Sequence, residues 1–358
     1  MNSTDKLFLL DAYALIYRAY YAFIKNPRIN SKGFNTSAIL GFVNTLEEVL
    51  KKENPSHIGV AFDPAGPTFR HEAYEQYKAQ REETPEAIRL SVPIIKDIIR
   101  AYRIPILEVS GYEADDVIGT LATEAGKGII TYMMTPDKDY GQLVSDKTFM
   151  YRPKHSGGFE VMGVEEVKAK FDIQSTSQVI DMLGLMGDSS DNIPGCPGVG
   201  EKTAQKLIAE FGSIENLLEH TDQLKGALKT KVENNREMII FSKFLATIKT
   251  DVPIKLDMNT LVREEPNEEE LRKIFEELEF RTLIDRVLKK TSTPSSPSPA
   301  SVSPDLFAGT LFAQEPTAIP EKNDPVQGDL FANFADNGTG DAKNSILTRL
   351  ETLDVDYQ

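Results

Sequence analysis

The sequence predicts an α/β fold built around a central, mostly parallel sheet. Four apolar runs have the length of buried strands, and segments with helical patterns separate them: Lys6–Leu10, Ile58–Phe62, Ile104–Val109 and Gly128–Met134. Acidic residues follow each run directly or within a few positions. Because ligand sites of parallel sheets lie beyond the carboxyl ends of the strands, we expect these carboxylates to share one crevice.

Nine carboxylates belong to this pattern, and they fall into five groups. Four groups follow the four runs in order, and the fifth ends an apolar helical pattern at Val179–Met186: Asp11; Asp63; Glu113, Asp115 and Asp116; Asp137 and Asp139; Asp188 and Asp191. A single loop Asp is more often a cap or turn residue. Nine converging carboxylates, however, would raise one another's pKa values and take up protons from water unless cations bind between them.

The residue types also indicate which metal the cluster would bind. Carboxylate oxygens select Mg²⁺ or Mn²⁺, whereas the four His and the single Cys are scattered and form no zinc set. Two such cations activate water and stabilise the transition state of phosphodiester hydrolysis. The sequence therefore predicts a metal-dependent phosphodiesterase.

Composition limits the remaining classes. The chain has 358 residues, 40% of them apolar, which allows two domains with sizeable cores. One cysteine excludes an internal disulfide framework, and the absence of a signal peptide or membrane-length apolar run predicts a cytoplasmic protein with no membrane partner.

The net charge of −15 is a poor guide to nucleic-acid binding. Residues 291–358 hold 10 acidic and 3 basic residues, and the rest is close to neutral without the nine clustered carboxylates. We expect an α/β body at 1–174, a helical subdomain at 175–290 and a disordered Pro/Ser-rich, acidic linker tail at 291–358. Residues 70–100 are charged and helical in pattern, as in a segment that a ligand orders.

A glycine-rich turn predicts contact with phosphates. Gly195, Gly198 and Gly200 lie between a helix that ends near Met186 and one at about 201–211. Glycines let backbone amides approach a phosphate, and Lys202, Thr203 and Lys206 begin the second helix. The segment 176–211 resembles a helix-hairpin-helix that grips DNA through its backbone; a plain helix–helix connection is the alternative.

Two aromatic and basic segments are further candidates for DNA contacts. Spacing puts Tyr74, Tyr77, Lys78 and Arg81 on one helix face after Arg70, which suits single-stranded bases and phosphates. A solvated charged face is the alternative. The helix after Asp11 carries Tyr17 and Arg18, and Tyr17 either stacks on a terminal base pair or packs in the core.

These motifs resemble the 5′–3′ exonuclease domain of bacterial DNA polymerase I, in the flap endonuclease superfamily. The matching segments span about residues 5–290: Asp11-Ala, Tyr17-Arg18, Phe62-Asp63, Tyr77-Lys-Ala-Gln-Arg81, Gly111-Tyr-Glu-Ala-Asp-Asp116, Asp137-Lys-Asp139, Gly187-Asp-Ser-Ser-Asp-Asn-Ile-Pro-Gly195 and Gly198-Val-Gly-Glu-Lys-Thr-Ala204. The resemblance implies a PIN-like flap-endonuclease fold with a helical arch at about 70–100. The chain ends before any polymerase motif, so we expect a fragment or a truncated product.

The resemblance also implies roles for single residues. Asp63, Glu113 and Asp115 would hold one metal, with Asp11 acting through water; Asp137, Asp139 and Asp191 would hold the second, with Asp115 reaching between the ions. Asp116 and Asp188 would act in the outer shell. Lys78 and Arg81, on the arch, would stabilise the scissile phosphate, and the Gly195–Gly200 turn would bind K⁺. Pro136 and Cys196 depart from the usual residues without removing a ligand.

The activity implied is that of a structure-specific 5′ nuclease acting on duplex DNA with a 5′ flap, nick or RNA primer. Its cellular setting would be primer removal and repair at the bacterial nucleoid, with a polymerase domain in cis if the chain is a fragment. The rival is a catalytically inactive DNA-junction-binding module, against which the intact carboxylates argue. A toxin-like ribonuclease of related fold would be shorter and would lack the helical clamp.

The tail carries one short motif. Gln327-Gly-Asp-Leu-Phe331 is similar to the Gln-x-x-Leu-Phe peptide with which bacterial replication proteins bind the sliding clamp. A disordered Leu-Phe pair can fill an apolar pocket while Gln anchors it. Coincidence is the alternative, because Asp305-Leu-Phe307 repeats the apolar pair without the Gln.

Overall fold

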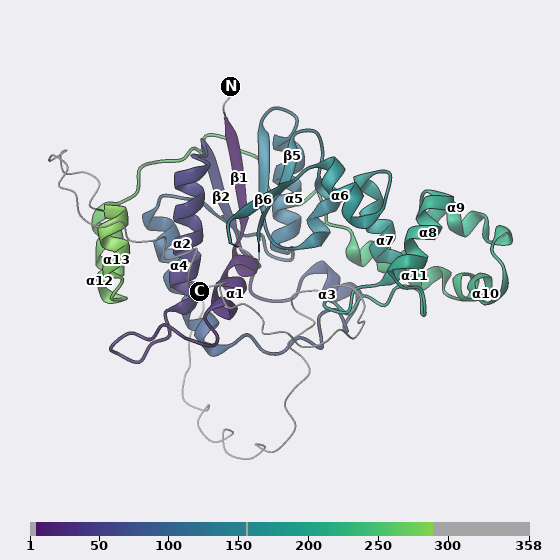
Figure 1. The fold of residues 1–358 in the computed structure, drawn as a ribbon, viewed down its shortest axis with the longest axis horizontal. Coiled ribbons are helices and arrows are strands. Elements are labelled where there is room, and N and C mark those ends of the chain that lie inside the picture. The colour runs from purple at the N-terminus through teal and green to yellow at the C-terminus, as the bar shows by residue number, and fades with distance from the viewer. Residues whose placement is uncertain (1–4, 155–156, 289–358) are drawn as a thin grey trace, which may run out of the picture. The chain divides into compact units, whose positions relative to one another are not determined.

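The computed structural model describes residues 5–154 and 157–288 (Figure 1). The tail at 291–358, including Gln327–Phe331, lies outside the described residues. The sheet has the order β3-β2-β1-β4-β5-β6. Its strands are β1 Lys6–Asp11, β2 His57–Ala61, β3 Ile106–Leu107, β4 Ile130–Met134, β5 Thr148–Pro153 and β6 Phe159–Met162.

The predicted mostly parallel sheet is confirmed. The first five strands run parallel, and only β6 pairs antiparallel, with β5. The register sets Asp11 beside Ala61 and Leu10 beside Met134, so β1, β2 and β4 end at the same edge. That edge therefore receives the segments that carry most of the carboxylates. Strands β5 and β6, which lie on the other side of β4 from β1, are not among the four runs predicted from the sequence.

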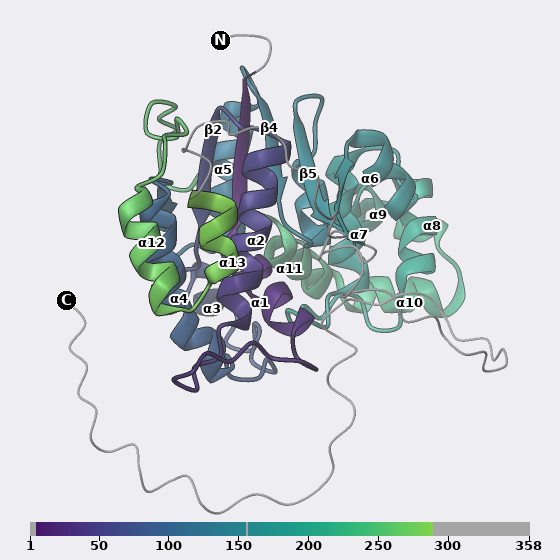
Figure 2. The same cartoon turned by 60° about the vertical axis from the view of Figure 1, so that its left-hand side comes forward.

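The central strand is apolar on both faces because helices cover both. Leu7 and Leu9 belong to one core cluster, and Phe8 and Leu10 to the other. Helix α5 (Ala114–Ala125) packs on the first face. Helices α1 (Ala12–Ala22), α2 (Ser37–Lys52) and α4 (Glu86–Ala101) line the second (Figure 2).

The helical subdomain follows α6 (Val164–Phe171). It contains α7 Val179–Met186, α8 Glu201–Phe211, α9 Ile214–Glu219, α10 Gly226–Asn234 and α11 Arg236–Ala246. The helices predicted on the two sides of the glycine-rich turn are thereby confirmed. Helix α11 packs along α7 and leads the chain back toward α5.

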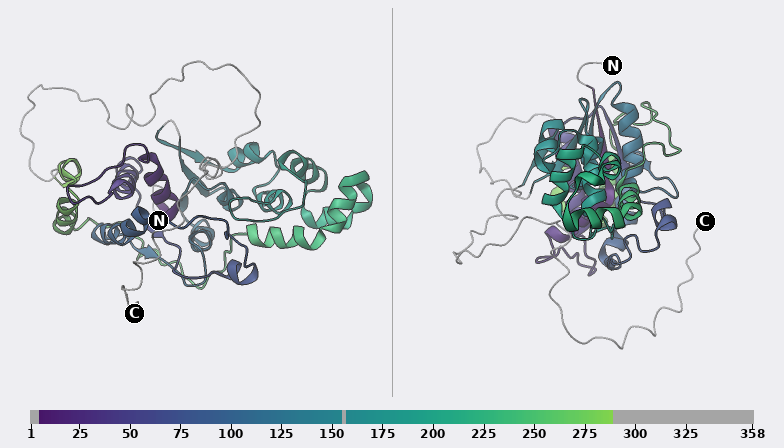
Figure 3. Two further views of the ribbon diagram at one scale, coloured as in Figure 1. Left: turned by 90° about the horizontal axis from the view of Figure 1, so that it is seen from below. Right: turned by 90° about the vertical axis from the view of Figure 1, so that its right-hand side faces the viewer.

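The last described helices do not stay with this subdomain. Helices α12 (Glu268–Glu277) and α13 (Arg281–Leu283) pack on the α/β body, where Leu271 and Phe275 are buried in the α2/α4 core. In Figure 3 these light-green helices lie across the sheet from the teal helices α7 to α10. The last part of the segment expected as a helical subdomain, 175–290, therefore packs with the α/β body instead. An amphipathic pattern predicts a helix but not the core that receives it.

The arch segment also differs from its expected form. Helix α3 covers only Phe69–Ala73, and no helix joins it to α4. Tyr74 is extended (φ −146°, ψ 99°), and Lys78 has a positive φ of 56°. The shared helix face proposed for Tyr74, Tyr77, Lys78 and Arg81 is therefore wrong. Pro85, which disfavours helical backbone at the residue before it, is a sequence signal for this break.

Candidate active site

The five carboxylate groups meet at the carboxyl-terminal edge of the sheet. Asp11 is the last residue of β1 and caps α1 by accepting from Ala14 N at 3.1 Å. Its other oxygen accepts from Thr135 Oγ1 (3.2 Å) and Tyr140 OH (3.1 Å). These two bonds connect the end of β1 to the segment after β4. They also give the buried Asp11 carboxylate hydrogen-bond partners.

The second and third groups meet at the start of α5. Asp63 Oδ1 accepts from Ala114 N at 2.7 Å, so the end of β2 caps this helix. Glu113, Asp115 and Asp116 each present an oxygen within 4.8 Å of the others. The N-terminal end of a helix favours negative charge, which partly offsets their repulsion. This group can hold a cation.

Arg70 occupies the buried side of that group. It is 1% exposed and makes five hydrogen bonds, to Glu113 Oε2, to both oxygens of Asp116, and to the carbonyls of Leu245 and Thr247. Arginine has five N–H donors, so every one has a partner. The prediction that Arg70 contacts DNA is therefore wrong: the carboxylates and helix-end carbonyls hold the guanidinium away from solvent.

Tyr77 is corrected for the same reason. Its side chain is 3% exposed, and its hydroxyl lies 3.0 Å from Glu113 Oε2 and 3.1 Å from Asp191 Oδ2. No face of the ring is open for a base. Tyr77 instead bridges the group at α5 and the group after α7.

Lys78 and Arg81 lie on the cluster even though no helix carries them. Lys78 Nζ is 2.7 Å from Glu113 Oε1 and 3.7 Å from Asp191 Oδ2. Arg81 forms an ion pair with Asp191 and donates to Ser190 O. Burial raises the pKa of Glu113, but the two cations Lys78 and Arg70 outweigh it, so this pKa is lowered. Both arch cations thus lie against the carboxylates.

The remaining carboxylates form the second half of the site. Lys138 Nζ pairs with Asp188 Oδ2 at 2.8 Å, while Asp188 Oδ1 accepts from Ser190 N. Asp139 Oδ1 is buried and has no hydrogen-bond partner among the described residues. A buried carboxylate oxygen without a donor is costly unless a cation binds it.

The electrostatics agree with a cation site. Burial, followed by the charges of Asp63 and Asp137, raises the pKa of Asp11 to about 7. Burial and then Asp116 raise the pKa of Asp115 well above its usual range, and burial and then Asp137 do the same for Asp139. All-oxygen donors, crowded charge and one orphaned carboxylate oxygen fit divalent cations.

The predicted hairpin forms between α7 and α8. Gly195 (φ 62°) packs against Gly187 so closely that a β-carbon on Gly195 would collide with the Gly187 backbone. The N–H of Gly195 donates to Ser242 Oγ at 2.9 Å. Gly198 and Gly200 are exposed, Gly200 is the residue before α8, and Thr203 lies in the first turn of that helix. Lys202 and Lys206 are exposed and form no ion pair in the described part of the chain.

One residue near the hairpin is not predicted from the sequence. Lys231, on α10, reaches Gly198 so closely that a β-carbon there would collide with its Nζ. Its distance of more than 30 positions from the turn leaves no local signal in the sequence. The structure therefore adds a cation beside the glycine-rich turn.

Tyr17 and Arg18 lie on the exposed side of α1. Tyr17 is half-buried, and its hydroxyl lies 2.9 Å from Thr84 Oγ1, just before α4 in the arch segment. Arg18 donates to Lys154 O at 3.3 Å. Neither side chain has a hydrogen bond to the nine carboxylates among the described residues, and Tyr17 packs against the core on the α1 side of the sheet.

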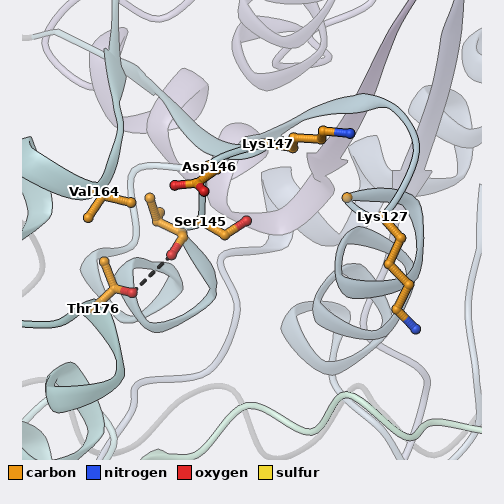
Figure 4. A pocket seen from close by; sticks show the side chains of 8 residues that line it. Lys127, Ser145, Asp146, Lys147, Val164 and Thr176 are labelled. Carbon is orange, nitrogen blue, oxygen red and sulfur yellow. Dashed lines mark hydrogen bonds between the residues drawn. The ribbon is translucent and has the colours of Figure 1, made fainter.

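A separate hollow lies at the opposite, amino-terminal edge of the sheet, before β4 and β5 (Figure 4). Thr176 Oγ1 donates to Val144 O across it at 2.9 Å. The other lining residues include Lys127, Ser145, Asp146, Lys147 and Val164. It is open and contains none of the nine carboxylates, so it is not the active site.

No helix among residues 5–154 and 157–288 combines the length and apolar character needed to cross a bilayer.

Two family models match successive parts of the chain. Residues 6–172 match the model of the 5′-3′ exonuclease N-terminal resolvase-like domain, and residues 174–269 match that of the 5′-3′ exonuclease C-terminal SAM fold. Both models describe domains of a 5′-3′ exonuclease. The chain belongs to the 5′–3′ exonuclease family, represented by the N-terminal region of bacterial DNA polymerase I.

Two curated relatives show the extent of the match. The chain is 44% identical over 291 residues to DNA polymerase I of Bacillus subtilis and 40% identical over 296 residues to that of Bacillus caldotenax. These matches cover 80% and 82% of this chain but 33% of each relative, so the chain spans about a third of their length.

Solved structures share the fold at low identity. T5 5′-exonuclease with bound zinc has a TM-score of 0.58 at 20% identity, and the match covers 77% of this chain and 98% of that one. The catalytic core of Rad2 with DNA substrate has a TM-score of 0.54 at 19% identity, covering 79% and 91%. The flap-nuclease fold predicted from the sequence is thereby confirmed.

Proposed function

We propose that this chain is a structure-specific 5′ nuclease that hydrolyses phosphodiester bonds near the 5′ ends or flaps of duplex DNA. The observation that carries the proposal is the convergence of nine carboxylates beside Lys78 and Arg81. The carboxylates supply a cation site, and the two basic side chains supply charge for a phosphate. The T5 flap endonuclease, which shares this fold, has been crystallised in a complex with DNA and metal ions, and this supports the same class.

Two Mg²⁺ or Mn²⁺ ions fit the proposal better than one. Asp63, Glu113 and Asp115 would hold one ion, with Asp11 acting through water, and Asp137, Asp139 and Asp191 would hold the other, with Asp115 between them. Arg70 binds both oxygens of Asp116, and Lys138 and Ser190 bind those of Asp188. These two carboxylates would therefore support the metal ligands rather than bind an ion directly. When bound, the ions would activate water and stabilise the developing charge.

The chain's own residues would perform the remaining steps. Lys78 and Arg81 now pair with Glu113 and Asp191, and a phosphate offers them an alternative anionic partner. Exchange of these partners would draw the arch segment onto the substrate. The hairpin, with a K⁺ ion at its backbone carbonyls, would hold the duplex strand without reading its sequence.

The cellular role in our proposal is removal of RNA primers and flaps at the nucleoid, in the cytoplasm, with a polymerase domain in cis if the chain is a fragment. The relatives support this role because they are DNA polymerases, and this chain matches about a third of their length. A catalytically inactive DNA-junction-binding module is the alternative. A 5′-labelled flap duplex incubated with and without Mg²⁺ separates the two: discrete products in Mg²⁺ alone support the nuclease, and binding without products supports the alternative.

The hairpin yields a prediction about binding. Lys202→Ala with Lys206→Ala should weaken binding to all duplex sequences about equally, because backbone contacts carry no sequence information. The dependence of log Kd on log salt should flatten by roughly one unit for each phosphate interaction removed, measured by fluorescence anisotropy. Lys52→Ala, an exposed lysine paired with Glu48 on α2, is the control. Sequence-selective weakening would contradict a backbone clamp.

The tail yields a second prediction. A peptide covering residues 325–334 should bind purified bacterial sliding clamp with micromolar affinity, about −8 kcal/mol, through Leu330 and Phe331. Replacing both by Ala should abolish binding, and the same change in the full chain should leave flap cleavage unaltered. The Asp305-Leu-Phe307 segment, which lacks the Gln, is the matched comparison. No binding at high micromolar clamp would leave the tail as a linker only.

A further inference from the structure

Arg70 links two parts of the molecule that the proposed function requires to work together. It lies in the short helix α3 at the base of the arch segment and faces the start of α5. One guanidinium edge donates to both oxygens of Asp116 at 2.8 Å, and Nη1 also donates to Glu113 at 2.8 Å. Such a two-pronged contact fixes the direction as well as the position of a carboxylate.

The other side of Arg70 holds the end of α11. Its Nε donates to Leu245 O at 2.9 Å, and Nη2 donates to Thr247 O at 2.8 Å. One turn earlier, the fully buried Ser242 of the same helix accepts the N–H of Gly195 in the hairpin. Hydrogen bonds and helix α11 therefore join the hairpin, Arg70 and the carboxylates.

Asp116 shows what Arg70 stabilises. The side chain of Asp116 has no exposed surface and lies next to Asp115, whose pKa burial and Asp116 raise. Besides Arg70, Asp116 accepts from the backbone N–H groups of Glu113 (3.1 Å) and Lys249 (2.8 Å). Without the guanidinium, a buried carboxylate would face other carboxylates with backbone donors alone.

We propose that Arg70 is a positioning residue of the cation site, which sets Glu113 and Asp116 and ties them to the end of α11. This inference rests on the proposed function, because it assigns a purpose to the carboxylate cluster. Lysine has the charge of Arg70 but carries its three donors on one atom, so it cannot reach the two carboxylates and the two carbonyls together.

Charge and geometry predict opposite effects of replacing Arg70. Removing a positive charge beside the carboxylates would by itself strengthen their attraction for a cation. Loss of positioning would weaken cation binding, since residues that orient metal ligands typically contribute about 10- to 100-fold to affinity. Arg70→Lys keeps the positive charge but loses the hydrogen-bond arrangement of the guanidinium, whereas Arg70→Gln loses both.

The experiment is calorimetric titration of the full chain with MnCl₂, without DNA, at temperatures below each variant's melting transition. Both Arg70→Lys and Arg70→Gln should bind Mn²⁺ about tenfold more weakly than the original chain. Lys243→Gln is the matched control, because it breaks another ion-pair network of α11, with Asp181 and Glu215. It should lower the melting temperature without changing the Mn²⁺ affinity.

The possible outcomes separate positioning from charge and from stability. Unchanged Mn²⁺ binding by Arg70→Lys, or tighter binding by Arg70→Gln, would overturn the positioning role. Equal weakening by Lys243→Gln would show that general destabilisation is the cause and would overturn it as well. If Arg70→Gln does not fold, Arg70→Lys carries the comparison. If the original chain binds Mn²⁺ and cleaves DNA while the variants titrate like it, this inference fails and the proposed function stands.

Discussion

Asp115→Asn should reduce cleavage of a 5′-flap duplex by several orders of magnitude while leaving duplex binding in Ca²⁺ close to its original strength. The carboxylate belongs to the group at the start of α5 that can hold a cation, and it lies 3.9 Å from Arg70. The amide keeps the shape of the side chain but not its charge, and removal of one catalytic electrostatic contact commonly costs about 100- to 1000-fold in rate. Single-turnover gel assays and anisotropy give the two quantities.

The same variant has a signature in stability. Burial and the Asp116 charge raise the pKa of Asp115, so its neutral replacement relieves repulsion. In EDTA the melting temperature of Asp115→Asn should equal or exceed that of the original chain, and the extra stability gained from Mg²⁺ should shrink. Asp146→Asn, at the opposite edge of the sheet, is the control. Near-normal cleavage by Asp115→Asn would refute the two-cation site.

The meeting of the carboxylates could be predicted from sequence because chain direction determines it. Asp11, Asp63 and Asp137 each follow a run that is apolar on both faces, and parallel strands end at one edge. The helical pattern of α7 likewise predicts that Asp188 and Asp191 lie close together, because both follow directly after the helix ends at Met186. Local periodicity and one topological rule are sufficient for both predictions.

The partners of the basic and aromatic side chains could not be predicted in that way. Arg70 bonds to residues 43 to 177 positions away, and no local pattern distinguishes a buried, saturated guanidinium from an exposed one. Tyr77 and Lys231 are similar cases. The return of α12 to the α/β core also depends on which apolar groove is vacant, a property of the assembled fold rather than of the segment.

Lys78→Ala and Arg81→Ala should each lower the single-turnover cleavage rate strongly, by about 100-fold or more, while changing substrate affinity little. Their charges reach the carboxylates at Glu113 and Asp191, where the scissile phosphate would lie. Charge on that phosphate grows toward the transition state, so a cation placed there stabilises the transition state more than the bound substrate. Quenched-flow single-turnover rates and Kd values in Ca²⁺ measure the two effects.

A matched variant makes this prediction specific. Arg100→Ala removes an exposed arginine of α4 that pairs only with Asp97 among the residues described, and it should change neither rate nor affinity. Lys78→Arg should restore part of the rate because it returns a cation to the carboxylates, whereas Lys78→Gln should not. Rate and affinity falling by the same factor in the Ala variants would instead make Lys78 and Arg81 ground-state phosphate contacts. The arch segment would then serve to hold the strand, and the acceleration would have to come from the carboxylate site alone.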